Sequence, residues 1–238
     1  MNKSEMVIVT AFDQSYANRG KALIESVLTN TPYNIIALVI NAPDEIVAVD
    51  PRVLHITHTE KFKSEEWKRH RCANIRVWLL SEALLRYGYQ KALWLDADSI
   101  VRGSICEIET LLDRFDTVAV KTPEFTEKEN QYLISTVGVS RRAWGNYFLL
   151  KWADFLEQIT DRKGPSIMHV QLAYKQTLDL NTFRFFDLTY EYSDKFFREF
   201  TPIWEAQGIR KFKDETYLKE EALYLARFSE REARRWKE

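Results

Sequence analysis

Two aspartates, Asp96 and Asp98, end a short apolar run in the stretch KALWLDADSIVR, residues 91–102. An apolar run without polar alternation is typical of a strand buried on both faces of a parallel sheet. Ligands of open α/β sheets bind at the carboxyl ends of such strands. Because paired carboxylates are costly without a positive partner, they favour a divalent cation, which would in turn hold phosphate oxygens. The structural alternative is an Asp-rich turn after a strand.

The composition is that of a globular chain with a sizeable core. It has 238 residues, of which 45% are hydrophobic. The 34 basic and 35 acidic residues give a net charge of −1, which does not support nucleic-acid binding. Cys72 and Cys106 lack metal-ligand spacing, so we expect interior thiols in a reducing compartment. Because no run resembles a signal peptide or a membrane span, we expect a cytoplasmic protein without an integral membrane segment.

The segments before Asp96 predict alternating strands and helices. We expect strands at 6–10, 35–40 and 53–57 and helices at 17–29 and 64–87. Strand, helix and strand without hairpin signals indicate parallel pairing through a right-handed crossover. The polar loop at 11–16 should therefore lie at the carboxyl edge of the sheet, on the same side as Asp96 and Asp98.

The segments after the aspartates continue this alternation. We expect helices at 105–115, 142–160 and 167–178, strands at 117–121, 133–140 and 182–188, a loop at 204–213 and a charged helix at 214–237. Gly138 lies inside a predicted strand, where a glycine often marks close approach of a ligand or of another backbone. The predicted fold class is α/β, with a single Rossmann-like, mostly parallel sheet flanked by helices and followed by a C-terminal helix.

The predicted organisation is one domain over residues 1–213 and a C-terminal helix over 214–238. Acidic and basic residues are mixed in this helix, unlike the basic face of a membrane-surface anchor. Its aromatic and aliphatic side chains can share one face. We therefore expect this face to pack on the domain or on a partner subunit, which leaves a homo-oligomer open.

Five segments, weak one by one, carry a resemblance when they are taken in order. They are VTAFDQSY (9–16), Arg76 in the helix before the aspartates, ALWLDADSIV (92–101), STVGVSRRAW (135–144) and EAQGIRK (205–211). Together they resemble the metal-dependent glycosyltransferases of the A-type fold, most closely family 8. The stretch HVQLAYK also resembles the family helix that begins Asp-Gln, and Gln171 matches its Gln.

The resemblance implies a hexosyltransferase that takes a UDP-sugar donor and a carbohydrate or other hydroxyl acceptor, with retention expected. Asp98 and Gln171 would be catalytic. Asp96, Asp98 and Glu205 would bind Mn²⁺ or Mg²⁺, with Glu205 in place of the family histidine. Donor contacts are implied for Ala11, Phe12, Asp13, Tyr16, Arg76, Asp96, Ala97, Gly208 and Lys211. In this group Gly208 would let the backbone approach closely, and Lys211 would add a positive charge to the diphosphate.

The sequence departs from the family pattern at several positions. Besides Glu205, Thr136 and Val137 replace an Asn-Ser pair, and Val170 replaces the Asp before Gln171. These departures leave open a catalytically inactive protein that binds nucleotide sugars. A sugar nucleotidyltransferase is a further alternative, but such enzymes carry a Gly-rich, basic loop after the first strand, and AFDQSY has neither glycine nor lysine.

Overall fold

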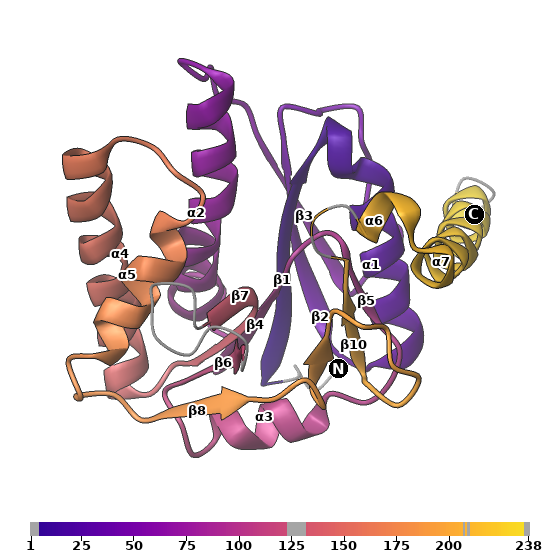
Figure 1. Ribbon diagram of the computed structural model, residues 1–238. Coiled ribbons are helices and arrows are strands. Elements are labelled where there is room, and N and C mark those ends of the chain that lie inside the picture. Colours follow the sequence, from indigo (N-terminus) through magenta and orange to yellow (C-terminus); the bar gives the residue numbers. More distant parts are fainter. Residues whose placement is uncertain (1–4, 123–131, 207, 209, 236–238) are drawn as a thin grey trace. The chain divides into compact units, whose positions relative to one another are not determined.

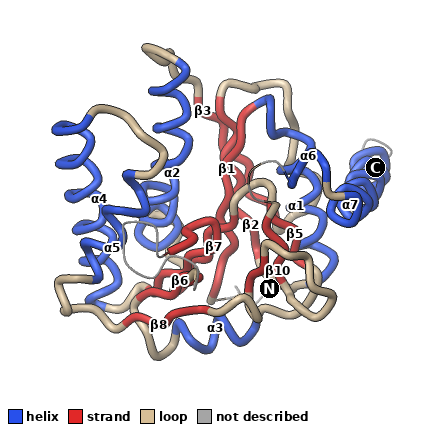
Figure 2. The backbone as a smooth tube through the Cα atoms, viewed as in Figure 1, coloured by secondary structure: helices blue, strands red, loops and turns tan. Residues whose placement is uncertain are grey.

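The computed structural model describes residues 5–122, 132–206, 208 and 210–235. Helices and strands alternate along most of the chain (Figures 1 and 2). In order they are β1 (Met6–Asp13), η1 (Gln14–Tyr16), α1 (Ala17–Asn30), β2 (Asn34–Ile40), β3 (Val53–His58), α2 (Glu65–Leu85), β4 (Lys91–Leu95), β5 (Ser99–Val101), α3 (Cys106–Leu112), β6 (Thr117–Lys121), β7 (Tyr132–Ser140), α4 (Ala143–Lys163), α5 (His169–Leu178), β8 (Phe185–Leu188), β9 (Ser193–Asp194), β10 (Ile203–Glu205), α6 (Arg210–Lys213) and α7 (Glu215–Arg235).

The strands of the described residues form two sheets. The larger has seven strands in the order β3-β2-β1-β4-β7-β6-β8, and the smaller has three in the order β5-β10-β9. In the larger sheet, β1 with β4, β2 with β3, and β6 with β8 are parallel pairs, whereas β6 and β7 are antiparallel. The α/β class and the mostly parallel sheet predicted from the sequence are confirmed.

The chain divides into two compact units. The first comprises residues 1–9, 61–94 and 106–189, and the second comprises 10–60, 95–105 and 190–238. Both β1 and β4 contribute residues to both units. Each unit is described below by its own contacts.

The first unit contains the pairing of β1 with β4, in which Val9 lies beside Trp94. Both strands are buried here, as an apolar run without alternation predicts. Gly138 of β7 is closely packed against side chains, whereas close approach of a ligand or of another backbone was expected. A Cβ atom at this position would lie 2.8 Å from a methyl group of Val118 and 3.0 Å from one of Leu112. Neighbouring side chains therefore account for the glycine.

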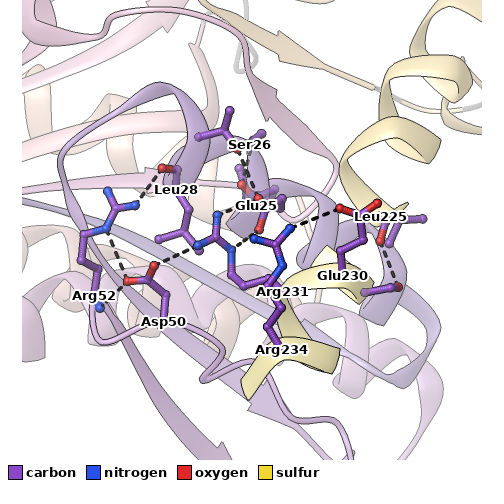
Figure 3. A network of polar contacts seen from close by, with 12 residues as sticks. Glu25, Ser26, Leu28, Asp50, Arg52, Leu225, Glu230, Arg231 and Arg234 are labelled. Carbon is purple, nitrogen blue, oxygen red and sulfur yellow. Dashed lines mark hydrogen bonds and ion pairs between the residues drawn. The ribbon is translucent and has the colours of Figure 1, made fainter. Parts of the chain in front are cut away.

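The second unit contains α1 and α7, which lie side by side (Figure 1). Figure 3 shows the polar contacts that join them. The guanidinium group of Arg231 donates to both carboxylate oxygens of Glu25, at 2.7 and 2.9 Å, and to Asp50 at 3.1 Å. Glu25 is 3% exposed, so its charge is neutralised by Arg231 rather than by water. The predicted C-terminal helix is thus present and packs on α1.

Three expectations about local structure are corrected. The predicted loop at 204–213 contains the end of β10 and the short helix α6, and β9 lies in a segment for which no strand was predicted. The last long strand, β8, begins at Phe185 rather than at residue 182. Cys106, at the start of α3, is exposed rather than interior, and Cys72 is only partly buried. Among the described residues, no helix combines the length and the apolar character needed to cross a membrane.

Candidate functional site

The turn after β4 carries the two aspartates. The N–H of Ser99 donates to the carbonyl oxygen of Asp96 at 2.9 Å, which closes the turn, and β5 then begins. Ala97 is buried between them, whereas Asp96 and Asp98 are half-buried. The carboxylates thus follow directly on the carboxyl end of a buried strand, where ligands of α/β sheets bind.

The small sheet joins this turn to a segment about a hundred residues further on. β5 pairs antiparallel with β10, with Ser99 opposite Glu205, and β10 pairs in parallel with β9. The N–H of Ala206 then donates to the carbonyl oxygen of Asp98 at 3.1 Å. Gly208 follows with a φ angle of 59°, a conformation that favours glycine. The chain next enters α6, which carries Lys211.

Lys211 meets Asp98 and Tyr16 in the second unit. Its Nζ atom lies 2.8 Å from Oδ2 of Asp98 and donates to the hydroxyl oxygen of Tyr16 at 2.7 Å. The side chains of Lys211 and Asp98 are only 14% and 15% exposed. Three segments that are far apart in the sequence therefore meet at one ammonium group: η1 with Tyr16, the turn after β4 with Asp98, and α6 with Lys211 itself.

Within this pair, the attraction between Asp98 and Lys211 opposes the effect of burial on the pKa of each group. Burial raises the pKa of Asp98, and the neighbouring charge of Asp96 adds to this rise, whereas Lys211 opposes it. Burial pulls the pKa of Lys211 down, but the charge and hydrogen bond of Asp98, together with Tyr16, outweigh it and the net shift is upward. The ammonium group is therefore held in its charged form.

Arg19 is a further member of this group that the sequence motifs did not indicate. Its Nη2 donates to the backbone carbonyl oxygen of Lys211 at 3.0 Å, and its Nε lies 3.5 Å from Oε1 of Glu221. The guanidinium group also lies over the rings of Phe212 and Tyr16, at 4.7 and 5.5 Å from their centroids. Its place on α1, one turn after Tyr16, was the available signal.

The residues at the end of β1 have different surroundings. The ring of Phe12 is buried under α1, because Gly20 has no Cβ and leaves room for it, and an added Cβ would come within 2.3 Å of the ring. The Phe12 side chain is therefore part of the core, and its predicted donor contact stays a prediction. The carboxylate of Asp13 accepts from the N–H and hydroxyl of Ser15, at 3.0 and 2.6 Å, and so caps η1. Ala11 is half-buried.

Glu205 does not join the two aspartates. It is 1% exposed, and its Oε1 accepts a hydrogen bond from the hydroxyl of Ser193 at 2.5 Å. Within the ranges that the structure describes, no three His, Cys, Asp or Glu side chains are grouped so that they could hold a metal ion. The three-carboxylate metal centre predicted from the sequence therefore does not fit this arrangement, because the Glu205 carboxylate is hydrogen-bonded to Ser193 of β9.

The remaining predicted site residues, Arg76 and Gln171, belong to the first unit. Arg76 is 7% exposed and donates to the carbonyl oxygens of Ile134 and Ala73, both at 2.6 Å, with its guanidinium over the Trp94 ring. Gln171 is half-buried near the start of α5. Val170 beside it is 1% exposed, so it contributes to the core.

Comparison with known proteins gives fold-level matches. No protein-family model matches the sequence, and no match is found among curated proteins. The bifunctional glycosyltransferase WbbM, in its apo form, aligns with 97% of this chain at a TM-score of 0.61 and 13% identity. The galactosyltransferase LgtC, in complex with donor and acceptor sugar analogs, aligns with 91% of this chain at a TM-score of 0.58 and 15% identity. The glycosyltransferase GlyE of Streptococcus pneumoniae TIGR4 aligns with 95% of this chain at a TM-score of 0.62 and 13% identity.

The chain has the A-type glycosyltransferase fold. At these identities the likeness establishes the fold and not the activity. The chain spans 52% of WbbM and 63% of GlyE, but 95% of LgtC. In the A-type fold of this chain, the strand-end turn that the sequence analysis singled out is the place where Asp98, Lys211 and Tyr16 meet.

Proposed function

We propose that this chain is a glycosyltransferase that moves a sugar, most simply a hexose, from a UDP-sugar to a hydroxyl group of a carbohydrate or other acceptor. One observation carries the proposal. In an A-type fold, the turn after a buried strand holds a carboxylate against a lysine and a tyrosine from two other segments. A solved galactosyltransferase with the same fold, LgtC, holds donor and acceptor sugar analogs, which supports the same ligand classes here.

The chemistry needs positive charge beside the diphosphate. When the glycosidic bond breaks, the leaving nucleotide gains negative charge, and preorganised cations or N–H donors stabilise it. Lys211 is such a cation, and the exposed Gly208 is a point at which a ligand can approach the backbone closely. The Mn²⁺ or Mg²⁺ implied by the resemblance stays a prediction for this site.

The transfer step is proposed to follow the retaining course. Gln171 carries a neutral amide, which is too weak to act as a nucleophile, so front-face attack by the acceptor hydroxyl is the simpler route. Asp13 and Tyr16 are proposed to face the uridine, Asp13 through its carboxylate and Tyr16 through its ring.

A second candidate is a protein that binds nucleotide sugars without turnover. The observation that favours it is the buried Val170, which puts an apolar side chain where the family carries an aspartate. Binding of donor without release of nucleotide would identify this case.

The test is a thermal-shift panel of UDP-, GDP- and dTDP-sugars followed by an assay of free UDP. A ligand that binds only the native state raises the melting temperature. We expect UDP-sugars to raise it and UDP to accumulate slowly, through hydrolysis, even without an acceptor. If no nucleotide sugar in the panel shifts the transition, the proposed function is wrong.

A further inference from the structure

The ammonium group of Lys211 occupies a defined position. Asp98 and Tyr16 accept two of its three N–H groups, and Arg19 holds its backbone carbonyl. A lysine side chain is long and flexible, so a fixed position requires such contacts. Arg19 is itself held by Glu221 and by contact with the rings of Tyr16 and Phe212. The side chain is therefore preorganised beside Asp98.

A divalent ion would compete with this ammonium group. To bind the Asp98 carboxylate it would have to displace Lys211 from a pair that is largely buried. Breaking a buried pair is costly because one charge is left without compensation. The third carboxylate that would offset this cost, Glu205, is held by Ser193. The arrangement therefore favours the lysine over a metal ion.

The same segment is rich in positive charge. α6 has the sequence RKFK and carries three cations in four residues. The described contacts of Lys211 leave its third N–H for an incoming phosphate oxygen, and charge-assisted hydrogen bonds of this kind are the strong ones. A diphosphate can thus be held beside Asp98 by donors that belong to the chain.

We infer that Lys211 supplies the positive charge that a metal ion supplies in the family this chain resembles, so that the donor diphosphate binds without a divalent cation. Asp98 is then a positioning residue that holds Lys211, and not a metal ligand. This inference rests on the proposed function, because it concerns how the same site binds its nucleotide.

The first test is calorimetric titration of the full chain with UDP, in a chelator and in saturating Mn²⁺ or Mg²⁺. We expect the UDP affinity measured in the chelator to agree within about threefold with the affinity measured in the metal-containing buffer. If UDP binds with metal but not in the chelator, the inference is wrong while the proposed function stands. If UDP binds under neither condition, both fail.

Variants give a second, independent test in the chelator. Lys211→Met removes the charge and keeps the length of the side chain, so we expect UDP affinity to fall by about tenfold or more. Asp98→Asn keeps an oxygen that accepts from Lys211 but removes the charge that holds it, so UDP affinity should fall by the same factor in the chelator and in Mn²⁺. The exposed Lys219→Met on α7 is the matched control and should change nothing.

The opposite pattern would overturn the inference. In that pattern, Asp98→Asn would lose only the increase in UDP affinity that the metal ion provides. Lys211→Met would bind UDP as tightly as the wild type does. Melting temperatures of each variant establish that it is folded. If Lys211→Met does not fold, the chelator titration and Asp98→Asn still decide the question.

Discussion

The hydroxyl group of Tyr217 donates a hydrogen bond to the backbone carbonyl oxygen of Asp98, across 3.1 Å. Tyr217 lies near the start of α7 and is fully buried. Burial raises the pKa of its phenol, and the charges of Glu221 and Asp98 raise it further. The phenol therefore stays protonated and acts as a donor. The C-terminal helix thus holds the turn that carries the aspartates.

Tyr217→Phe removes this hydrogen bond and preserves the ring packing. We expect the free energy of unfolding to fall by about 1 kcal/mol and the melting temperature by about 2–4 °C. UDP should bind about threefold more weakly, because the turn loses one of its supports. Thermal unfolding and calorimetry measure both effects. The control is Tyr147→Phe on the exposed face of α4, and equal behaviour of the two variants would contradict the role of Tyr217.

Glu205→Gln should leave UDP affinity unchanged, both with and without Mn²⁺. The amide oxygen of glutamine can still accept the hydrogen bond from Ser193, so the β9–β10 contact survives. Titration of UDP into both chains gives the comparison. A loss of affinity confined to the metal-containing buffer would show that Glu205 binds the ion after all.

Arg231→Met should destabilise the chain, because it leaves the buried carboxylate of Glu25 without its partner. Arg231 is itself 33% exposed, which reduces the effect, so we expect a loss of about 2 kcal/mol in the free energy of unfolding. Urea unfolding measures this loss.

The control for this change lies three residues along the same helix. Arg234 pairs with Glu230 at 3.6 Å, but both side chains are mostly exposed. Arg234→Met should therefore cost less than about 0.5 kcal/mol. The variant pair Glu25→Gln with Arg231→Met should recover part of the stability, since the unpaired charge is gone. Equal losses for Arg231 and Arg234 would refute the assigned role of the buried pair.

His169 should make the stability of the chain depend on pH. It is 7% exposed, and its pKa is lowered by burial first and then by the charges of His70 and Lys163. The native state therefore binds fewer protons than the unfolded chain, whose histidine titrates near about 6.5. This contribution to stability is present above the unfolded pKa and is lost as the pH falls through the folded pKa.

We therefore expect the urea midpoint to fall between about pH 7.5 and about pH 5.5, and His169→Gln to reduce that fall. His58, which pairs with Glu60 near the surface, provides the control variant His58→Gln. If His169→Gln and the wild type show the same pH slope, the buried histidine does not contribute.

The strand that positions the aspartates could be predicted because its signal lies in consecutive residues of the sequence. The run at 92–95 needs apolar residues on both faces, and the two aspartates mark where it ends. β9 and β10 were not predictable in this way. They span two and three residues, which is too short to show a period of two. No strand was therefore predicted at 193–194, and most of β10 fell within the predicted loop at 204–213.

The direction of a side chain depends on residues elsewhere in the chain, and this limits prediction of the site. The resemblance implies a donor contact for Phe12, but it does not indicate that the missing Cβ of Gly20 admits the Phe12 ring to the core. Glu205 has the family spacing to Gly208, yet Ser193 decides where its carboxylate lies. Neither partner is visible in the local pattern.

The pairing of Asp98 with Lys211 joins residues 113 positions apart in the sequence. Contacts of such long range close late in folding, because the loop-closure entropy must be overcome first. During synthesis, the β4 turn emerges long before β10, α6 and Tyr217, and domains fold only when their parts are present. The proposed nucleotide affinity should therefore arise only after Lys211 and Tyr217 have both been made and can reach the β4 turn.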